Sequence, residues 1–582
     1  MQNIIIYLIL IIQKYLQKII ICSIIYIEDR GIHMEKNYEV KLDNHKKSFK
    51  EGTTFKEIAD YYKNNYDSEI IGVKVNDDFK NLDEKLDRDC IITFYTINSE
   101  YGISVYSRSA RFMLVLAVQR VFGKKADVLI HHSLNQGLYF TIEGVKIGKN
   151  SLELLNKEFQ NIIDSDLLFS HITTSRLDAI NYLHQKKMYD KERLFKYMPN
   201  TYVTFYKLDD LYGYFYGKMA YSTKQIKLYK LTSMNDIFIL NLPTVDCPNK
   251  IIETDLNVKM NQRYQLAIGF ERSINVNNAS DLNLKISKSE IKDIILMSEA
   301  YFDDQLLELA DDIILKKKRI ILLAGPSSSG KTTTAKKLCI FLKSKGYNTI
   351  SISLDDYFID LANRTTDQNG NIDLESLNAL DVKLFNSDLN KLLNNEEVIL
   401  PSYDFVSGRR YYAKEAITLN KNDIIVIEGL HAINDDLTSS IDKKYKYKVF
   451  ISPLQSLKID NHNHIHSTDV RKLRRITRDN RTRGYNATKT LQHWSNIHKG
   501  EMKNVFPYSF DTDAVIDSCL LYEIGVLKTY VEPLLYSVDS DNPEYSEALR
   551  LINLLRKFLP ISSEDIPNDS VLREFIGNSI FK

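Results

Sequence analysis

The spacing of apolar and polar residues changes along the chain and predicts three successive domains after the first 33 residues. In residues 34–98, short alternating or wholly apolar runs surround one stretch, 51–66, in which apolar residues recur at helical intervals. Thr53 and Thr54 are candidate caps for the first turn of that helix. The order strand, turn, strand, helix, strand predicts a small mixed domain.

The second predicted domain, residues 99–275, has a different pattern. A largely apolar run over 107–122 is followed by the stretch 128–140, which includes a strand. The aromatic stretch 201–217 favours a packed sheet over a platform for stacking bases, because no arginines are interleaved with its rings. We therefore expect an α+β domain here.

The third predicted domain, residues 276–582, alternates helices and strands. Residues 287–318 predict one or two helices that lead into a buried strand over 320–324, and 332–346 predict an amphipathic helix that ends on a glycine. Two further apolar strands follow. This alternation predicts an α/β fold with a parallel sheet.

Composition and charge narrow the choice of partners. The chain has 582 residues, 44% hydrophobic and 26% charged, so it is long enough for two to four globular domains. Its net charge of +1 gives no reason to propose DNA, and does not indicate RNA, as a partner. The cysteines are odd in number, far apart and without a C-x-x-C pair, which favours a reducing cytoplasm over disulfides or zinc; they are Cys22, Cys90, Cys247, Cys339 and Cys519.

The first 33 residues differ from the rest. Two isoleucine-rich runs flank the polar stretch 13–18, so no uninterrupted apolar span of about 20 residues exists. We expect translation to begin at Met34, because Glu28–Gly31 can be read as a purine-rich ribosome site translated in error. A membrane-associated segment is the alternative.

The clearest chemical signal is the glycine-rich turn Gly325–Thr332, which reads G-x-x-x-x-G-K-T. Glycine permits backbone angles that turn N–H groups inward around phosphate oxygens, Lys331 adds a cation for the β and γ phosphates, and the Thr332 hydroxyl can ligate Mg²⁺. The following helix points its positive end at the same anion. The pattern predicts bound ATP or GTP with Mg²⁺, contacted by Gly325, Pro326, Ser327, Ser328, Ser329, Gly330, Lys331, Thr332 and Thr333.

Two of the later apolar strands end in carboxylates. Asp355 and Asp356 follow one strand and Glu428 ends the other. Because the carboxyl ends of parallel strands meet at one edge of the sheet, these side chains should lie beside the phosphate loop. Asp355 can accept the proton of an attacking hydroxyl, Asp356 is interpreted as a helix cap, and Glu428 is a candidate metal ligand together with Thr332.

An arginine-rich helix is predicted over residues 467–486, which contain six arginines and one lysine. Spacings of three and four put Arg471, Arg474, Arg475 and Arg478 on one face. Such a face suits a lid that closes over polyphosphate. A solvated basic face is the alternative.

These features, in this order, resemble the uridine kinase and phosphoribulokinase family of P-loop kinases. The resemblance runs from about Ile320 to Leu535 and is carried by D-D-Y-F, L-P-S-Y-D-F, I-E-G-L-H-A-I and the arginine helix. It implies that Asp355 activates a nucleoside 5′-hydroxyl and that Asp373 binds a ribose hydroxyl. Tyr403 would lie beside the base, and the phosphates would be met by Arg471, Arg475 and Arg478.

One segment departs from the family pattern. Uridine kinases usually read Y-D-F-x-x-H-x-R, in which the histidine contacts the pyrimidine. Gly408 holds the histidine position here, with Arg409 and Arg410 beyond, and Arg410 is a candidate substrate contact. Glycine has no side chain with which to read a base, so phosphoryl transfer is expected but uridine specificity is in doubt.

The front of the chain resembles two parts of aminoacyl-tRNA synthetases. Residues 34–98 resemble the β-grasp TGS domain, and 99–275 look like the second domain of threonyl- and alanyl-tRNA synthetases, in which H-S-x-x-H binds a metal for editing. Arg108 and Phe112 hold those histidine positions here, so editing hydrolysis should be absent. The neighbouring pair His131 and His132 is interpreted as structural, because adjacent residues of a strand point to opposite faces.

The sequence therefore predicts a cytoplasmic, Mg²⁺-dependent kinase of a nucleoside-like small molecule, with Asp355, Lys331 and Arg475 as its catalytic set. The ending S-V-L-R-E-F-I-G, together with the TGS-like front, resembles a fused bacterial subgroup called uridine or nucleoside kinase. An RNA- or ribosome-associated regulator that uses nucleotide binding as a switch is the alternative. We also expect the front half to dock on the kinase half and to shape the acceptor pocket.

Overall fold

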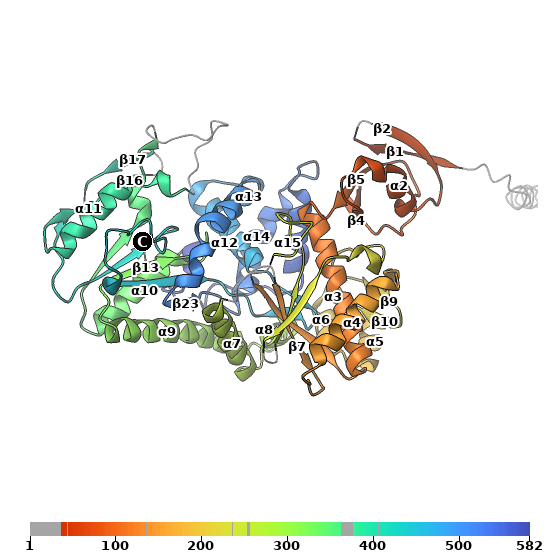
Figure 1. Ribbon diagram of the computed structural model, residues 1–582, viewed down its shortest axis with the longest axis horizontal. Helices are drawn as coiled ribbons and strands as arrows, with labels where there is room; N and C mark the ends of the chain where they lie inside the picture. The colour runs from red at the N-terminus through yellow and green to blue at the C-terminus, as the bar shows by residue number, and fades with distance from the viewer. Residues whose placement is uncertain are drawn as a thin grey trace, which may run out of the picture.

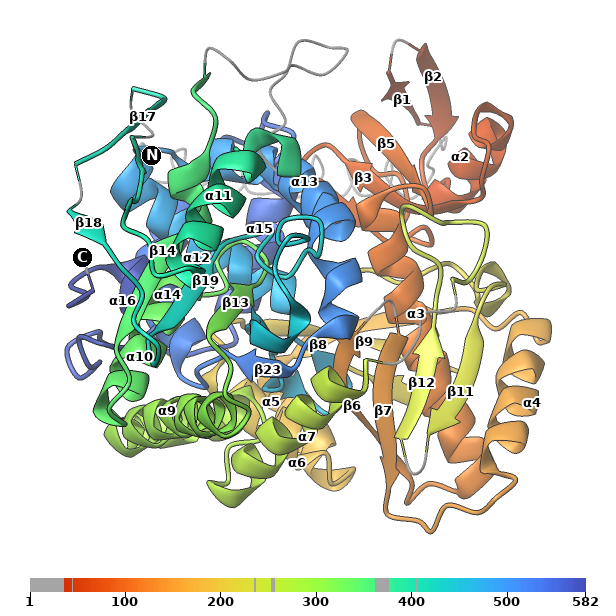
Figure 2. The ribbon, with the colours of Figure 1, turned by 60° about the vertical axis from the view of Figure 1, so that its left-hand side comes forward.

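The computed structural model describes residues 36–43, 45–134, 137–234, 237–252, 257–361, 376–404, 407–413 and 415–581. Figures 1 and 2 show a small β-rich unit, a mixed region beside it, and a larger α/β region at the other side. Within the described ranges, no helix has both the length and the apolar character to cross a membrane. The isoleucine-rich start of the chain lies outside them.

The small unit is a five-stranded sheet covered by one helix. Its strand order is β2-β1-β5-β3-β4, and β1 and β5 run parallel. Thr54 accepts a hydrogen bond from the backbone of Glu57, whose side chain returns to the Thr54 N–H, so the predicted cap is confirmed. The elements are β1 (Asn37–Leu42), β2 (His45–Lys50), α2 (Phe55–Tyr62), β3 (Ile70–Val75), β4 (Asp78–Lys80) and β5 (Cys90–Thr96).

The mixed region has two antiparallel sheets, ordered β10-β9-β8 and β11-β12-β7-β6. Aromatic residues of 201–217 pack in its core, with Phe205 and Tyr214 buried, as the packed-sheet interpretation requires. The elements are α3 (Glu100–Phe122), β6 (Asp127–Leu134), β7 (Gly137–Glu143), α4 (Ser151–Asp164), β8 (Ser170–Ser175), α5 (Arg176–Gln185), α6 (Tyr189–Tyr197), β9 (Tyr202–Leu208), β10 (Leu211–Gly213), β11 (Lys230–Met234) and β12 (Ile237–Asn241).

The α/β region is built on a parallel sheet of order β14-β19-β13-β20-β23, as predicted from the alternation of helices and strands. The strands are β13 (Ile320–Ala324), β14 (Thr349–Ser353), β19 (Ile424–Glu428), β20 (Lys446–Ser452) and β23 (Ala514–Asp517). Three two-stranded sheets accompany it: β15 (Val398–Ile399) with β18 (Ala416–Ile417), the hairpin β16 (Ser402–Asp404) and β17 (Arg409–Tyr411), and the hairpin β21 (Lys458–Asp460) and β22 (Asn463–His464).

Helices pack against this sheet and lead into it. The stretch predicted as one or two helices is a single helix, α9, which runs along one side of the molecule in Figure 1. The helices are α7 (Val258–Ser273), α8 (Ala279–Ser287), α9 (Ile291–Leu315), α10 (Lys331–Ser344), α11 (Val382–Leu393), α12 (Ser467–Arg483), α13 (Ala487–Asn504), α14 (Glu523–Tyr536), α15 (Tyr545–Leu555) and α16 (Arg573–Ile576).

The mixed region and the α/β region share an apolar core. Leu194 and Phe195 of α6 belong to the same buried cluster as Leu282 of α8 and Leu473 of α12. The core is therefore continuous across residue 275, where the sequence pattern suggests a domain boundary.

Candidate active site

The phosphate loop lies between β13, at the centre of the sheet, and the start of α10. Gly330 has a φ of +87° and caps the helix, and a Cβ at Gly325 would lie 2.0 Å from the carbonyl oxygen of Ile451 on β20. Both glycines are thus required by the backbone. Lys331 folds back over the loop, and its Nζ donates to the carbonyl oxygens of Gly325 at 3.0 Å and Pro326 at 3.2 Å.

Glu428, at the end of β19, faces the loop and meets two hydroxyls. Its Oε1 accepts from Thr332 Oγ1 at 3.3 Å and from Ser353 Oγ at 2.9 Å. Burial and, next, the nearby Asp355 carboxylate raise the pKa of Glu428 to about 7, whereas Lys331 opposes the shift. Carboxylate and hydroxyl oxygens are ligands that Mg²⁺ prefers, and P-loop sites leave the other positions to phosphate and water. The pair Thr332 and Glu428 therefore fits the predicted metal.

Asp355 and Asp356 lie in a single turn, Leu354–Tyr357, directly after β14. Burial among protein atoms raises the pKa of Asp355, and the cations of Lys331 and Arg483 oppose that shift, while its side chain keeps an exposed edge. The sequence suggested that Asp356 caps a helix, but the residue lies inside the turn, whose N-cap position is Ser353. The Asp356 Oδ1 instead accepts the backbone N–H of Tyr403 at 3.2 Å and holds β16 against the turn.

The hairpin β16–β17 carries two of the predicted acceptor contacts. The ring of Tyr403 packs 5.7 Å from that of Phe358. The guanidinium of Arg410 pairs with Asp381 at 3.1 Å and donates to the carbonyl oxygen of Phe358 at 3.0 Å, so it supports the turn that holds Asp355. Asp373, the predicted ribose ligand, lies outside the described residues.

The arginine helix α12 is packed into the protein, which corrects the prediction of a lid with four arginines over polyphosphate. Arg471 and Arg474 are 1% and 0% exposed, and they donate to the loop carbonyl oxygens of Ser327 at 2.9 Å and Ser328 at 3.3 Å. Spacing placed them on one face, but that face is turned to the loop backbone and to core carboxylates.

Two arginines of α12 stay partly exposed beside the loop. Arg475 donates to Ser327 Oγ at 2.5 Å and pairs with Asp479 at 3.1 Å. Arg478 also meets Asp479, at 3.4 Å. Burial lowers the pKa of Arg478 to about 10, with the neighbouring Arg483 acting in the same direction. Contact of Arg475 and Arg478 with a bound polyphosphate stays a prediction.

Two carboxylates at the loop were missed in the sequence. Glu501 of α13 accepts the backbone N–H of Ser327 at 2.7 Å. Glu574 of α16 accepts from both the backbone N–H and the hydroxyl of Thr333, at 3.2 Å and 2.9 Å. Neither sits in a local motif, and the only signal for Glu574 was its place in the ending S-V-L-R-E-F-I-G.

The residues that replace the editing histidines of the synthetases are packed inside this protein. Phe112 is fully buried, 5.1 Å from the ring of Phe215, and Arg108 donates to the carbonyl oxygen of Lys218. His131 meets Thr141 Oγ1 at 2.9 Å, and His132 stacks on Tyr264 of α7 at 3.6 Å. In the part of the chain that the structure describes, no group of three or more His, Cys, Asp or Glu residues could hold a metal.

Comparisons with known proteins match two parts of the chain to different proteins. Residues 320–523 match the model of the phosphoribulokinase / uridine kinase family. The N-terminal region is similar to threonine–tRNA ligase of Acetivibrio thermocellus, 26% identical over 194 residues, which are 33% of this chain and 30% of the relative. Threonine–tRNA ligase 2 of Bacillus subtilis is 26% identical over 208 residues, 35% of this chain and 32% of the relative. The chain thus spans about a third of the length of these curated relatives.

Among solved structures, one titled "Possible Uridine Kinase" from Bacillus stearothermophilus is 24% identical, with a TM-score of 0.21, and the match covers 25% of this chain and 79% of that one. The loop, the carboxylates at the strand ends and the family match agree with one another. Residues 320–523 are therefore a domain of the phosphoribulokinase / uridine kinase family, preceded by a region similar to part of threonine–tRNA ligase.

Proposed function

We propose that this protein transfers the γ phosphoryl group of ATP to the 5′-hydroxyl of a nucleoside-like acceptor. One observation carries the proposal: the Asp355 carboxylate, the Lys331 ammonium group and the Thr332–Glu428 pair meet at the ends of three adjacent parallel strands. These charged groups lie close enough to influence one another. Burial lowers the pKa of Lys331, and the carboxylates of Glu428 and Asp355 both oppose that shift.

In the proposed reaction, Asp355 takes the proton of the acceptor hydroxyl. The oxygen then forms a bond to the γ phosphorus while the bond from that phosphorus to the β-phosphate oxygen breaks, which leaves ADP and a phosphorylated acceptor. Lys331 and the loop N–H groups hold the negative oxygens of the transferring group. Bound Mg²⁺, held by Thr332 and Glu428, would supply further charge neutralisation.

A reducing cytoplasm suits the four described cysteines, which are free.

The test is release of ADP from Mg²⁺ and ATP in the presence of single nucleosides and small polyols. We expect one acceptor to stimulate release, and Asp355→Asn to lower kcat by about 10²–10⁴-fold, because a positioned general base contributes that much. ATP affinity should change little. Asp442→Asn, in an exposed turn away from the site, is the control. Full activity of Asp355→Asn would show that Asp355 is not the general base.

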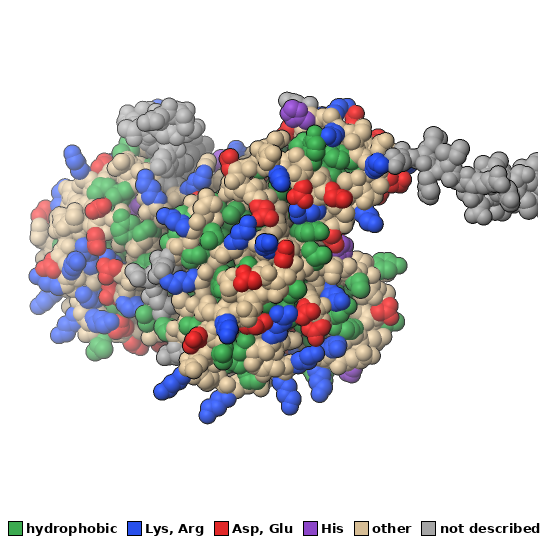
Figure 3. All heavy atoms as spheres, turned by 45° about the vertical axis from the view of Figure 1, so that its right-hand side comes forward, with side chains coloured by type: hydrophobic (Ala, Val, Ile, Leu, Met, Phe, Trp, Pro, Cys, Tyr) green, Lys and Arg blue, Asp and Glu red, His purple; other side chains and the backbone are tan. Residues whose placement is uncertain are grey.

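An RNA-associated regulator is the second candidate, favoured by the similarity of the N-terminal region to threonine–tRNA ligase. Figure 3 shows acidic and basic side chains interspersed over one face of the molecule, where a nucleic-acid surface would be mostly basic. Retention of the protein on immobilised RNA, without any acceptor that stimulates ADP release, would favour this candidate over the kinase.

A further inference from the structure

We propose that the C-terminal segment Val571–Gly577 is an intramolecular occupant of the nucleotide site, which must move before ATP can bind. The inference rests on the proposed function, because it assigns Gly325–Thr333 to a triphosphate. In such loops the backbone N–H groups at the start of the helix cradle the α and β phosphates. Glu574 places its carboxylate on two donors of that cradle.

One oxygen of Glu574 accepts both the N–H and the hydroxyl of Thr333, in the first turn of α10. The amino end of a helix attracts an anion, and a carboxylate satisfies the same donors that a phosphate would. Two anions cannot share them, since like charges at contact distance repel. The carboxylate and the α phosphate therefore compete.

Val571 blocks the neighbouring part of the loop. Its Cγ2 lies 2.3 Å from where a Cβ on Gly330 would stand, and the Val571 side chain is fully buried. An apolar side chain thus covers the glycine that turns the loop into the helix. The segment is therefore packed on the loop at Gly330 as well as bonded to it at Thr333.

The segment is fastened to the elements that also hold the loop. Arg481 of α12 donates to the carbonyl oxygens of Glu574 at 3.1 Å and Phe575 at 3.2 Å. Lys337 of α10 pairs with Asp569 at 3.0 Å. Since α12 also contacts Ser327 through Arg471, release of the segment and rearrangement of the loop involve the same helix.

Two further donors of the loop also bond to groups of the chain itself. Glu501 holds the N–H of Ser327, and Lys331 is turned onto the carbonyl oxygens of its own loop. A bound triphosphate needs the Lys331 ammonium group. If this arrangement has to open before ATP binds, as we propose, the apparent affinity for ATP is reduced by the fraction of molecules that are closed.

The first test measures the Kd of Mg²⁺·ATP for the full chain without any acceptor. Glu574→Gln keeps an oxygen for Thr333 but removes the charge, and Glu574→Ala removes both. We expect ATP to bind more tightly, by about tenfold for the alanine variant if the closed state dominates by that factor, and by less for the glutamine variant. Glu564→Gln, exposed and seven residues before the segment, should leave the Kd unchanged. Unchanged or weaker binding by both Glu574 variants would overturn the inference.

A second test uses the unaltered protein, so it does not depend on whether the variants fold. Hydrogen exchange at the amides of 571–577 should become faster when Mg²⁺·ADP is added, because the segment is displaced. Slower exchange would mean that the segment closes over the nucleotide and would contradict the proposal. If Glu574→Ala binds ATP more tightly but no acceptor is phosphorylated, the kinase proposal is wrong. The proposal that the segment 571–577 occupies the nucleotide site would still be supported.

Discussion

At the scale of single residues, Gly408 shows how the backbone decides which side chain a site can carry. Its φ is +68°, and a Cβ there would lie 2.8 Å from the Cβ of Leu361. The carbonyl oxygen of Gly408 also accepts the Leu361 N–H at 2.8 Å, so the two segments cannot separate without losing a hydrogen bond. A histidine at this position would be strained and would collide. The backbone of this hairpin therefore favours glycine at position 408.

Replacing Gly408 tests this explanation. We expect Gly408→Ala to lower the free energy of unfolding by about 1–2 kcal/mol for the left-handed backbone, plus a further loss from the contact with Leu361. Gly346→Ala is the matched control, because Gly346 has a φ of +88° but open space around its Cα. Urea unfolding of both variants separates strain from collision. Equal losses of unfolding free energy in the two variants would show that Leu361 moves aside at no measurable cost.

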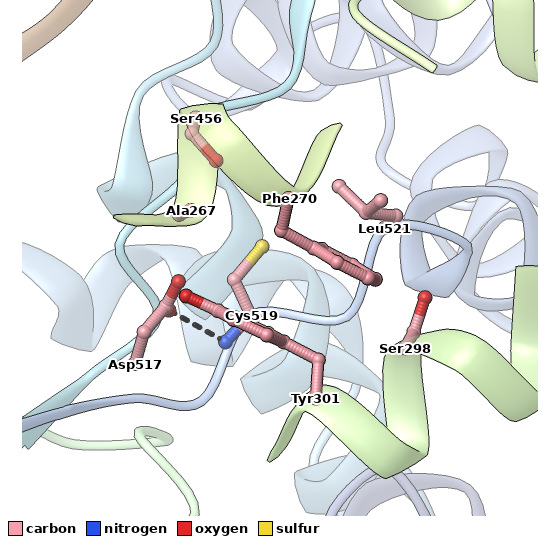
Figure 4. A pocket seen from close by; sticks show the side chains of 8 residues that line it. All are labelled: Ala267, Phe270, Ser298, Tyr301, Ser456, Asp517, Cys519 and Leu521. Atoms are coloured by element: carbon pink, nitrogen blue, oxygen red, sulfur yellow. Dashed lines mark hydrogen bonds between the residues drawn. The ribbon is translucent and has the colours of Figure 1, made fainter. Parts of the chain in front are cut away.

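At the scale of elements, the buried carboxylate of Asp517, the last residue of β23, holds the chain that follows β23 to the chain that follows the neighbouring strand β20. Asp517 is 2% exposed, and its Oδ1 accepts the backbone N–H groups of Leu454 and Cys519, both at 2.8 Å. Figure 4 shows Asp517 beside Tyr301 and Cys519, with its bond to the Cys519 nitrogen. Burial raises the pKa of Asp517 to about 7, although the two N–H donors oppose the shift.

This raised pKa predicts a dependence of stability on pH. The folded protein holds the Asp517 proton more tightly than the unfolded chain, so its contribution to stability is complete below about pH 4 and is lost as pH rises through about 7. Asp517→Asn keeps the acceptor oxygen and cannot ionise. Between pH 6 and pH 8 its free energy of unfolding should gain about 1 kcal/mol relative to the unaltered protein.

Urea unfolding at the two pH values measures the difference. Asp541→Asn, in an exposed loop, is the control and should show no change. If the difference between Asp517→Asn and the unaltered protein is the same at pH 6 and pH 8, then Asp517 does not titrate in this range.

At the scale of the whole molecule, the hairpin β21–β22 fastens the kinase domain to the mixed region. The carbonyl oxygen of Asn461 accepts the N–H of Ile130 at 2.9 Å, and His462 pairs with Asp127 at 3.0 Å. Lys191 of α6, 1% exposed, pairs with Asp460 at 3.2 Å. Docking of the front half is thus seen in the structure, while its effect on the acceptor pocket stays a prediction. The chain passes from this hairpin directly into α12.

Lys191→Met tests whether docking supports the nucleotide site. It leaves Asp460 buried without its cation, which should lower the free energy of unfolding by about 3–5 kcal/mol. We also expect weaker ATP binding, because α12 begins three residues after the hairpin and carries the arginines that hold the loop. Lys196→Met, on the same helix with a half-exposed ion pair, should cost less than about 1 kcal/mol. Similar losses in both variants would argue against a docking role for Lys191.

The sequence alone determined those functional groups that lie within one short segment of the chain. The phosphate loop, the strand that ends in Asp355 and the strand that ends in Glu428 could each be predicted, because one short segment contains both the structural signal and the reactive group. The capped helix α2 was predictable for the same reason: Thr54 and Glu57 are three residues apart.

Only the tertiary structure decided which residues far away in the sequence contact the phosphate loop. Glu501 and Glu574 lie 174 and 241 residues from their loop partners, so no local pattern marks them. The spacing of Arg471 and Arg474 showed that they share a helix face but not that this face is buried, because helical periodicity is the same whether a charged face meets solvent or buried carboxylates. Burial and charge pairing depend on which other elements pack there, and that is a property of the folded chain.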